Sequence, residues 1–374
     1  MRLSLSDPAG TRHPWLSALL LPILALTPCP LQADPTAFAQ YAAARAVEAA
    51  EKNHRVVAGE APGWLFLSSE LKHIGTADFW NHPESMRGGD PVAAIIAYHE
   101  ALKALGITLV VVPVPAKAAI YPDKLSTSHP SGTAMASTPF FEKLAAAGVA
   151  AVNLEPVFLR ERENQKVYCE QDSHWSPWAC RLAADQICAL PAVQACLPVR
   201  DMATPQGEEI SITGDLANVL EPNSPPHETI MAFPAAMPPV PPDDNSPVIL
   251  LGDSHTIVFS EAGGTIKNHT TGSGLRDHLQ ARLGTPLAVI ATAASGADGA
   301  RGLLARKAAS TPTPTSGTIG NSSSGASAPA NSPKVGGALS PPNPAGFKKS
   351  RSAAPPKVQP PTHGQHSKIS YTQS

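Results

Sequence analysis

The sequence predicts an α/β protein with a mainly parallel sheet flanked by helices. Apolar runs at 107–112, 149–154 and 247–251 have the composition of strands that are buried on both faces. Helical segments alternate with these runs along the chain, and this order is typical of α/β folds. A length of 374 residues is enough for one large domain or two ordinary ones.

Turn and cap residues delimit each element. An Ala-rich helical segment covers 35–57, and a short apolar strand at 63–67 follows a Pro-Gly turn. Asp90 and Pro91 cap and begin the next helix, which Gly106 ends before the strand at 107–112. The remaining predicted elements are helices at 140–147, 177–190 and 279–283 and a last strand at 287–291.

The charge is divided between an acidic body and a basic tail. The chain has 28 Lys/Arg and 30 Asp/Glu, a net charge of −2, which excludes a generally basic nucleic-acid binder. From Arg301 onward there are nine basic and no acidic residues, so residues 1–300 carry a net charge of −11. The Pro/Ser-rich segment 306–374 cannot bury enough apolar area to fold and is predicted to be disordered. A Pro-rich insertion at 221–247 is expected on the surface.

Residues 1–33 are predicted to be a cleaved signal peptide. Two arginines precede an apolar run at 15–26, which is shorter than the ~20 residues that a transmembrane helix needs. Small Ala33 precedes the predicted cut, and we therefore expect the mature protein to be exported. A lipid anchor at Cys29 and a buried N-terminal helix are the alternatives, and neighbouring prolines disfavour both.

Four cysteines remain after the signal peptide is removed, and an even number in an oxidising compartment predicts disulfides. Cys188–Cys196 is the first predicted pair and Cys169–Cys180 the second. Two cysteines at 180 and 188 of one helix would lie ~12 Å apart along its axis, which is beyond bonding distance. A zinc site is disfavoured because the chain has no CxxC or HExxH spacing.

The segment Leu-Gly-Asp-Ser-His at 251–255 is the first candidate for chemistry. Ser254 follows a predicted buried strand, and α/β enzymes place their sites at this carboxyl edge of the sheet. Gly252 allows a sharp turn, and the N–H of Ser254 would stabilise an oxyanion at the start of a helical turn. The alternative is that Asp253 and Ser254 merely cap a helix.

The segment Asp-Ser-His-Trp at 172–175 is the second candidate. It lies just before a helix that begins at Ser176-Pro177, and residues two apart in an extended loop face the same side. Asp172 could therefore bind the Nδ1–H of His174 and leave Nε2 free as the base that a serine nucleophile requires. Trp175 would shield such a site. The alternative is a surface histidine beside a capping aspartate.

Five segments occur in the order seen in periplasmic alginate O-acetyltransferases of the AlgX/AlgJ type, which the chain resembles over about residues 60–305. They are GWLFL at 63–67, VVPVPAKAAIYPDKL at 111–125, QDSHWSPWAC at 171–180, GDL at 214–216 and LLGDSHTIVF at 250–259. The resemblance implies a permuted SGNH-hydrolase-like domain at 34–305, in which Asp and His precede the serine. Carried over, Ser254 is the nucleophile, His174 the general base and Asp172 the residue that orients His174.

The resemblance also implies a function. Such enzymes move an acetyl group through an acetyl-serine onto hydroxyls of an exported polysaccharide, in the periplasm and without a cofactor or metal. The donor would be a membrane-bound O-acyltransferase or another acetyl carrier. Gly296 would supply a second oxyanion N–H, and His255, in place of the family's usual aromatic residue, would line the pocket with Trp175. A serine acetyl-esterase and a non-catalytic polysaccharide-binding or assembly scaffold are the alternatives.

The C-terminal part departs from the family. Members of the family continue after the position of Arg301 with a further strand and helix, whereas this chain has the low-complexity segment 306–374. A tail that replaces these elements would leave a sheet edge unpaired and expose the serine strand. This departure leaves a chain with impaired folding or turnover as an alternative to an active O-acyltransferase.

Overall fold

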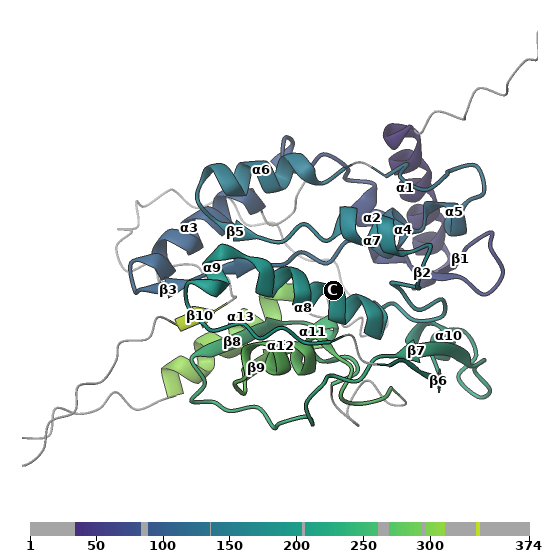
Figure 1. Cartoon of the computed structure of the whole chain (residues 1–374). Helices are drawn as coiled ribbons and strands as arrows, with labels where there is room; N and C mark the ends of the chain where they lie inside the picture. The colour runs from purple at the N-terminus through teal and green to yellow at the C-terminus, as the bar shows by residue number, and fades with distance from the viewer. Residues whose placement is uncertain are drawn as a thin grey trace, which may run out of the picture. The chain divides into compact units, whose positions relative to one another are not determined.

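A computed structural model describes residues 34–83, 89–134, 136–203, 206–260, 269–293, 296–310 and 334–336 (Figure 1). The predicted signal peptide and most of the predicted tail lie outside these residues. Within the described part of the chain, no helix combines the length and apolar character that crossing a bilayer requires.

The N-terminal elements form one side of the main core. α1 (Pro35–Glu51) begins at Asp34, whose side chain accepts hydrogen bonds from two N–H groups of the first turn. α1 packs on α2 (Ser68–Ile74), and between them in sequence β1 (Val56–Ala58) and β2 (Leu65–Leu67) form an antiparallel pair. The predicted helix over 35–57 therefore ends at Glu51, before a strand.

The predicted strand at 107–112 is divided in two. α3 (Pro91–Lys103) begins at the predicted Asp90 cap and precedes β3 (Ile107–Thr108) and β4 (Val110–Val111). β4 pairs in parallel with β5 (Ala150–Ala151), which follows α6 (Thr138–Ala146). The short helices α4 (Lys117–Ile120) and α5 (Pro122–Leu125) follow β4 in the chain, and α7 (Glu155–Glu161) follows β5.

The second half of the described chain carries the predicted serine strand. α8 (Pro177–Ala189) packs against α12 (Leu275–Leu283), and β8 (Val248–Gly252) pairs in parallel with β9 (Ala288–Ala291) (Figure 1). The other elements here are α9 (Pro191–Gln194), β6 (Glu208–Ile212), α10 (Asp215–Leu220), β7 (Glu228–Ala232), α11 (Ser254–Ile257), α13 (Gly296–Ser310) and β10 (Lys334–Gly336).

The described strands form four small sheets instead of the single, mainly parallel sheet that the sequence predicts. The largest has the order β3-β10-β8-β9 with parallel pairs, and β4-β5 is also parallel. The two-stranded sheets β1-β2 and β6-β7 are antiparallel. The prediction of a mainly parallel sheet is therefore not confirmed for the whole domain, although the serine strand β8 lies in a parallel sheet.

β8 is paired unequally on its two sides. β9 pairs with Ile249 to Gly252, whereas β10 on the other side pairs with Val248 and Ile249. Among the described residues, Leu250 and Leu251 have no partner strand on that second side. Both line one large cavity together with residues of β4.

Three sequence predictions need correction. α13 runs to Ser310 and β10 lies at 334–336, so the prediction of disorder from residue 306 is not confirmed for these two segments. The insertion at 221–247 is not only a surface loop, because it contains β7, whose pairing with β6 buries Ile230 and Ala232.

The third correction concerns the disulfides. All four cysteines in the described chain are free thiols, so neither predicted pair exists in the structure. Their side chains are directed to other partners: the Sγ of Cys196 lies 3.4 Å from the hydroxyl of Thr108, and the thiol of Cys169 lies 4.0 Å from the carbonyl of Trp175. Burial raises the pKa of the Cys169 and Cys180 thiols well above their ordinary range.

Candidate active site

Ser254 lies at the first position of α11, two residues after β8 ends. A Cβ at Gly252 would lie 2.1 Å from the hydroxyl oxygen of Thr256, so a larger residue at the end of the strand would have to displace that side chain. The Asp253 side chain caps the single turn by accepting the N–H of His255 at 3.0 Å. The N–H of Ser254 is at a position where a helix has no internal acceptor for it.

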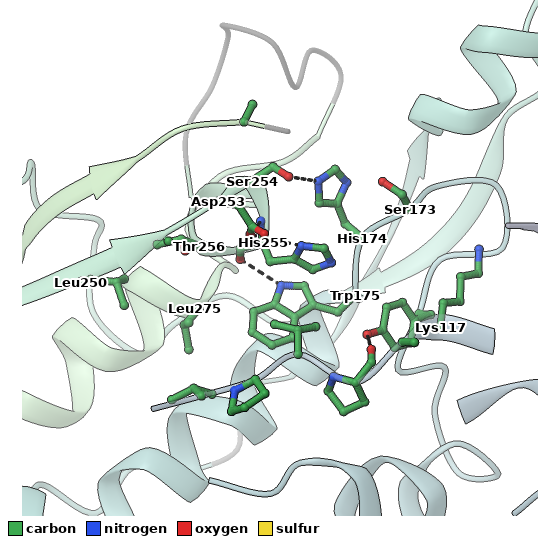
Figure 2. Close-up of a pocket in the computed structure, with 18 of the residues that line it drawn as sticks. Lys117, Ser173, His174, Trp175, Leu250, Asp253, Ser254, His255, Thr256 and Leu275 are labelled. Atoms are coloured by element: carbon green, nitrogen blue, oxygen red, sulfur yellow. Dashed lines mark hydrogen bonds and ion pairs between the residues drawn. The ribbon is translucent and has the colours of Figure 1, made fainter. Parts of the chain in front are cut away.

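His174 and Asp172 lie on the loop before α8, as the sequence predicts, and the imidazole of His174 points toward the hydroxyl of Ser254 (Figure 2). His174 Nε2 is 2.7 Å from Ser254 Oγ, and His174 Nδ1 is 2.6 Å from Asp172 Oδ1. The side chains of Ser254, His174 and Asp172 thus form one continuous hydrogen-bonded relay. Asp172 is fully buried and His174 is nearly so.

The Asp172 carboxylate accepts four hydrogen bonds, which fixes its orientation. Oδ1 accepts the backbone N–H and the Nδ1–H of His174 at 2.9 and 2.6 Å. Oδ2 accepts the backbone N–H of Asp215 at 2.8 Å and bonds His269 Nε2 at 3.1 Å. A carboxylate offers about four lone-pair positions, and all are used here.

Two of these partners were not recognised from the sequence. Asp215 lies in the Gly-Asp-Leu segment that carries part of the family resemblance, and its carboxylate in turn accepts the N–H and hydroxyl of Ser173 at 2.7 and 2.6 Å. His269 is distant in sequence from the other site residues and has no motif around it. No feature of the sequence would have placed it beside Asp172.

The charges of this cluster shift one another's pKa values. Burial alone would raise the pKa of Asp172, but His174 and His269 hold it well below its usual range. Burial likewise opposes the charging of His174, yet the Asp172 carboxylate outweighs it and raises the pKa of His174 above the ordinary imidazole value. The pKa of Asp215 is raised by burial and by the neighbouring charge of Asp172. The relay therefore favours an ionised Asp172 and a basic His174.

Trp175 connects the two candidate segments. Its indole N–H donates to the backbone carbonyl of His255 at 3.1 Å, and its ring is almost completely buried (Figure 2). The ring of His255 lies edge-on to Trp175 with centroids 5.6 Å apart, and 4.9 Å from the ring of His174. Both residues line the cavity at Ser254, as the sequence predicts.

Gly296 is the first residue of α13, the helix that follows β9. Ala293, which lies between β9 and α13, lines the cavity. The assignment of the Gly296 N–H as a second oxyanion donor stays a prediction.

The cavity beside Ser254 has a volume of about 1400 Å³. Its lining includes the polar residues Ser254, His174 and His269 and apolar side chains of β4, β8 and α12. Ligand sites commonly combine an apolar wall with a few convergent polar groups in this way.

Asp172, His174 and Asp215 bring three possible metal-ligand atoms within 4.8 Å of one another. Their donor atoms do not fit a metal ion, because the Asp172 oxygens already accept four hydrogen bonds and the Asp215 oxygens bind Ser173. The cluster is better suited to moving a proton: the Ser254 hydroxyl can pass its proton to His174 Nε2, and the oxygen can then attack an acyl carbon.

The fold and the site define an α/β protein with a Ser–His–Asp relay at the end of a parallel strand. The family model described as "SGNH hydrolase-like domain, acetyltransferase AlgX" matches residues 56–316, which is more than half of the chain. The chain therefore belongs to this AlgX/AlgJ-type family, as the resemblance implied.

Curated relatives match part of the chain. A protein named probable alginate O-acetylase AlgJ from Pseudomonas aeruginosa is 28% identical over 161 residues, covering 42% of this chain and 39% of the relative. The protein of the same name from Pseudomonas syringae pv. tomato is 27% identical over 160 residues, with the same coverage. The match spans about two fifths of the length of these relatives.

Two solved structures are also similar. The O-acetyltransferase domain of Pseudomonas putida AlgJ has 23% sequence identity and a TM-score of 0.46, covering 65% of this chain and 81% of that one. Pseudomonas aeruginosa AlgX has 18% identity and a TM-score of 0.46, covering 65% of this chain and 56% of that one.

Proposed function

We propose that this domain is an O-acetyltransferase that forms an acetyl-serine at Ser254 and transfers the acetyl group to a hydroxyl of an exported polysaccharide. The observation that carries the proposal is the relay of Ser254, His174 and Asp172, with distances of 2.7 and 2.6 Å, beside a large cavity. Membership of the AlgX/AlgJ-type family supports the choice of acetyl transfer.

In the first half-reaction, Ser254 Oγ attacks the carbonyl carbon of the acetyl donor while His174 Nε2 takes the hydroxyl proton. The tetrahedral oxyanion would be bound by the N–H of Ser254 and, as predicted from the sequence, that of Gly296. His174 then gives its proton to the leaving oxygen of the donor as the bond to the acetyl carbon breaks. Asp172 keeps the imidazole in the Nδ1–H tautomer and stabilises its charged form.

In the second half-reaction, a sugar hydroxyl takes the place of the leaving group. His174 Nε2 removes its proton, the sugar oxygen attacks the acetyl carbon, and the Ser254 oxygen leaves and regains a proton from His174. Hydrolysis differs only in that water attacks. A sugar held next to the acetyl group would outcompete water through its effective molarity, and an esterase is the outcome if no sugar is held.

The substrates and location are part of the same proposal. The relatives named probable alginate O-acetylases support an alginate-like polysaccharide as acceptor. The donor would be a membrane-bound O-acyltransferase or another acetyl carrier, and the reaction would take place in the periplasm after removal of the predicted signal peptide. The two half-reactions use this chain's own residues and need no cofactor.

Trapping the acetyl-enzyme tests the proposal. We expect an aryl acetate to acetylate the protein, and peptide mass spectrometry to place the acetyl group on Ser254. Ser254→Ala should abolish both the adduct and the turnover, whereas Ser69→Ala, which changes an exposed serine lining the same cavity, should not. If Ser254→Ala and the wild type had equal turnover, the catalytic proposal would be refuted and a non-catalytic scaffold would be the remaining interpretation. With an oligosaccharide present, acetyl on the sugar identifies a transferase and free acetate an esterase.

A further inference from the structure

A buried lysine ammonium holds the backbone of the loop that carries Asp172 and His174. Lys117 is the first residue of α4, and the residue is 1% exposed. Its Nζ donates to the carbonyls of Leu65, Glu170 and Asp172 at 2.7, 2.9 and 2.9 Å. An ammonium has three N–H donors, so each has a backbone acceptor, and two of the three acceptors belong to this loop.

A buried carboxylate binds the N–H groups of the same loop, whereas Lys117 binds its carbonyls. Glu228 on β7 is 4% exposed, and its two oxygens accept the N–H groups of Glu170 and Gln171 at 2.7 and 2.9 Å. Hydrogen bonds to charged groups are stronger than those between neutral groups. Lys117 and Glu228 therefore fix residues 170–172 from two different elements of the fold.

Neither side chain is part of the relay itself. All donors of Lys117 and both oxygens of Glu228 are engaged with backbone groups, and the relay consists of Asp172, His174 and Ser254. The position of the loop backbone nevertheless sets where the side chains of Asp172 and His174 point. The carbonyl that Lys117 binds is that of Asp172 itself.

We propose that Lys117 and Glu228 act as a pair of positioning residues, which hold the 170–174 loop so that His174 Nε2 lies within hydrogen-bond distance of Ser254. This role rests on the proposed function, in which His174 is the base. Removal of either charge should let the loop shift. A misplacement of about 1 Å in a reacting geometry lowers the rate by roughly a hundredfold.

Two variants and a matched control test this role. Lys117→Met keeps the length of the side chain without its donors, and Glu228→Gln keeps the volume but puts an amide donor against one N–H. We expect kcat for an aryl acetate to fall roughly a hundredfold, with KM changed by less than about twofold. Lys143→Met removes a lysine that donates to the carbonyl of Trp80, outside the site, and should keep the wild-type kcat.

A spectroscopic measurement separates positioning from general destabilisation. The proton between His174 Nδ1 and Asp172 should give a far-downfield NMR resonance in the wild type and in Lys143→Met, and a shifted or lost one in the two site variants. If Lys117→Met does not fold, Glu228→Gln decides. A folded Lys117→Met or Glu228→Gln with wild-type kcat and an unchanged resonance overturns the proposal. Failure of Ser254→Ala to reduce turnover refutes the proposed function instead, and the resonance then still tests the loop.

Discussion

Replacement of Asp172 by asparagine probes the centre of the relay with almost no change of shape. The carboxylate accepts four N–H groups, two on each oxygen. An asparagine has one oxygen and one NH₂ group, so two of those donors must face another donor whichever way the amide lies. Asp172→Asn therefore creates a hydrogen-bond conflict that no rotation of the amide removes.

The cost follows from the two amide orientations. With the amide oxygen toward His174, the NH₂ group faces His269 and the N–H of Asp215. His269 can adapt by moving its proton to Nδ1, which has no partner among the described residues. The N–H of Asp215 cannot adapt and loses its acceptor. One buried unsatisfied donor costs about 1–3 kcal/mol of unfolding free energy. With the NH₂ toward His174, the imidazole takes the wrong tautomer and Nε2 can no longer accept a proton. Loss of the charge and the tautomer together lowers kcat by roughly 10⁴.

Urea denaturation and aryl-acetate kinetics measure the two effects separately. We expect Asp172→Asn to lose about 1–3 kcal/mol of stability and roughly 10⁴ in kcat. The exposed Asp201→Asn serves as the matched control and should change neither. A folded Asp172→Asn that keeps kcat within about tenfold of wild type would refute the reasoning, because the relay would then not need an anion at this position.

Three further predictions follow from the same geometry. His174 must be neutral to take the serine proton, and the Asp172 carboxylate raises the pKa of His174 above 6.5 despite its burial. We therefore expect kcat/KM to rise with pH through a midpoint above that value, and the stability that the His174–Asp172 pair contributes to be lost over the same range. A flat pH profile of kcat/KM would contradict this. Gly214→Ala places a Cβ 2.0 Å from the carbonyl of Gln171 and should cost about 1–3 kcal/mol in urea denaturation, whereas Gly302→Ala, with its nearest contact at 3.4 Å, should be neutral or slightly stabilising. Because the four cysteines of the described domain are free thiols, a reducing agent should leave Tm unchanged, and a fall on reduction would restore the disulfide prediction.

Local signals made the strands and the relay residues predictable. The apolar run at 247–251 became β8, and the Ser-Pro pair became the cap and first residue of α8. Residues 172 and 174 do face each other, but the loop is bent and not extended as predicted, and the Asp172 carboxylate accepts both the backbone N–H and the Nδ1–H of His174. A serine after a parallel strand lies at the sheet's carboxyl edge. Each of these inferences depends on a few adjacent residues, which a sequence displays directly.

Contacts over long sequence separations were not predictable in the same way. The disulfide prediction failed because cysteine spacing does not show side-chain direction, and Cys196 contacts Thr108, which lies 88 positions away. The prolines of the insertion at 221–247 predict a surface loop, yet the insertion contains Glu228, whose carboxylate binds the 170–174 loop. No local pattern distinguishes that glutamate from an exposed one.

The sequence by itself determined where the relay residues lie along the chain, because strand endings, helix caps and the family's motifs are short-range features. Only the tertiary structure decided how those groups are held. Lys117, Asp215, Glu228 and His269 come from four separate segments, and they converge on one loop because burial requires each charged or polar group to find a partner, wherever in the chain that partner lies.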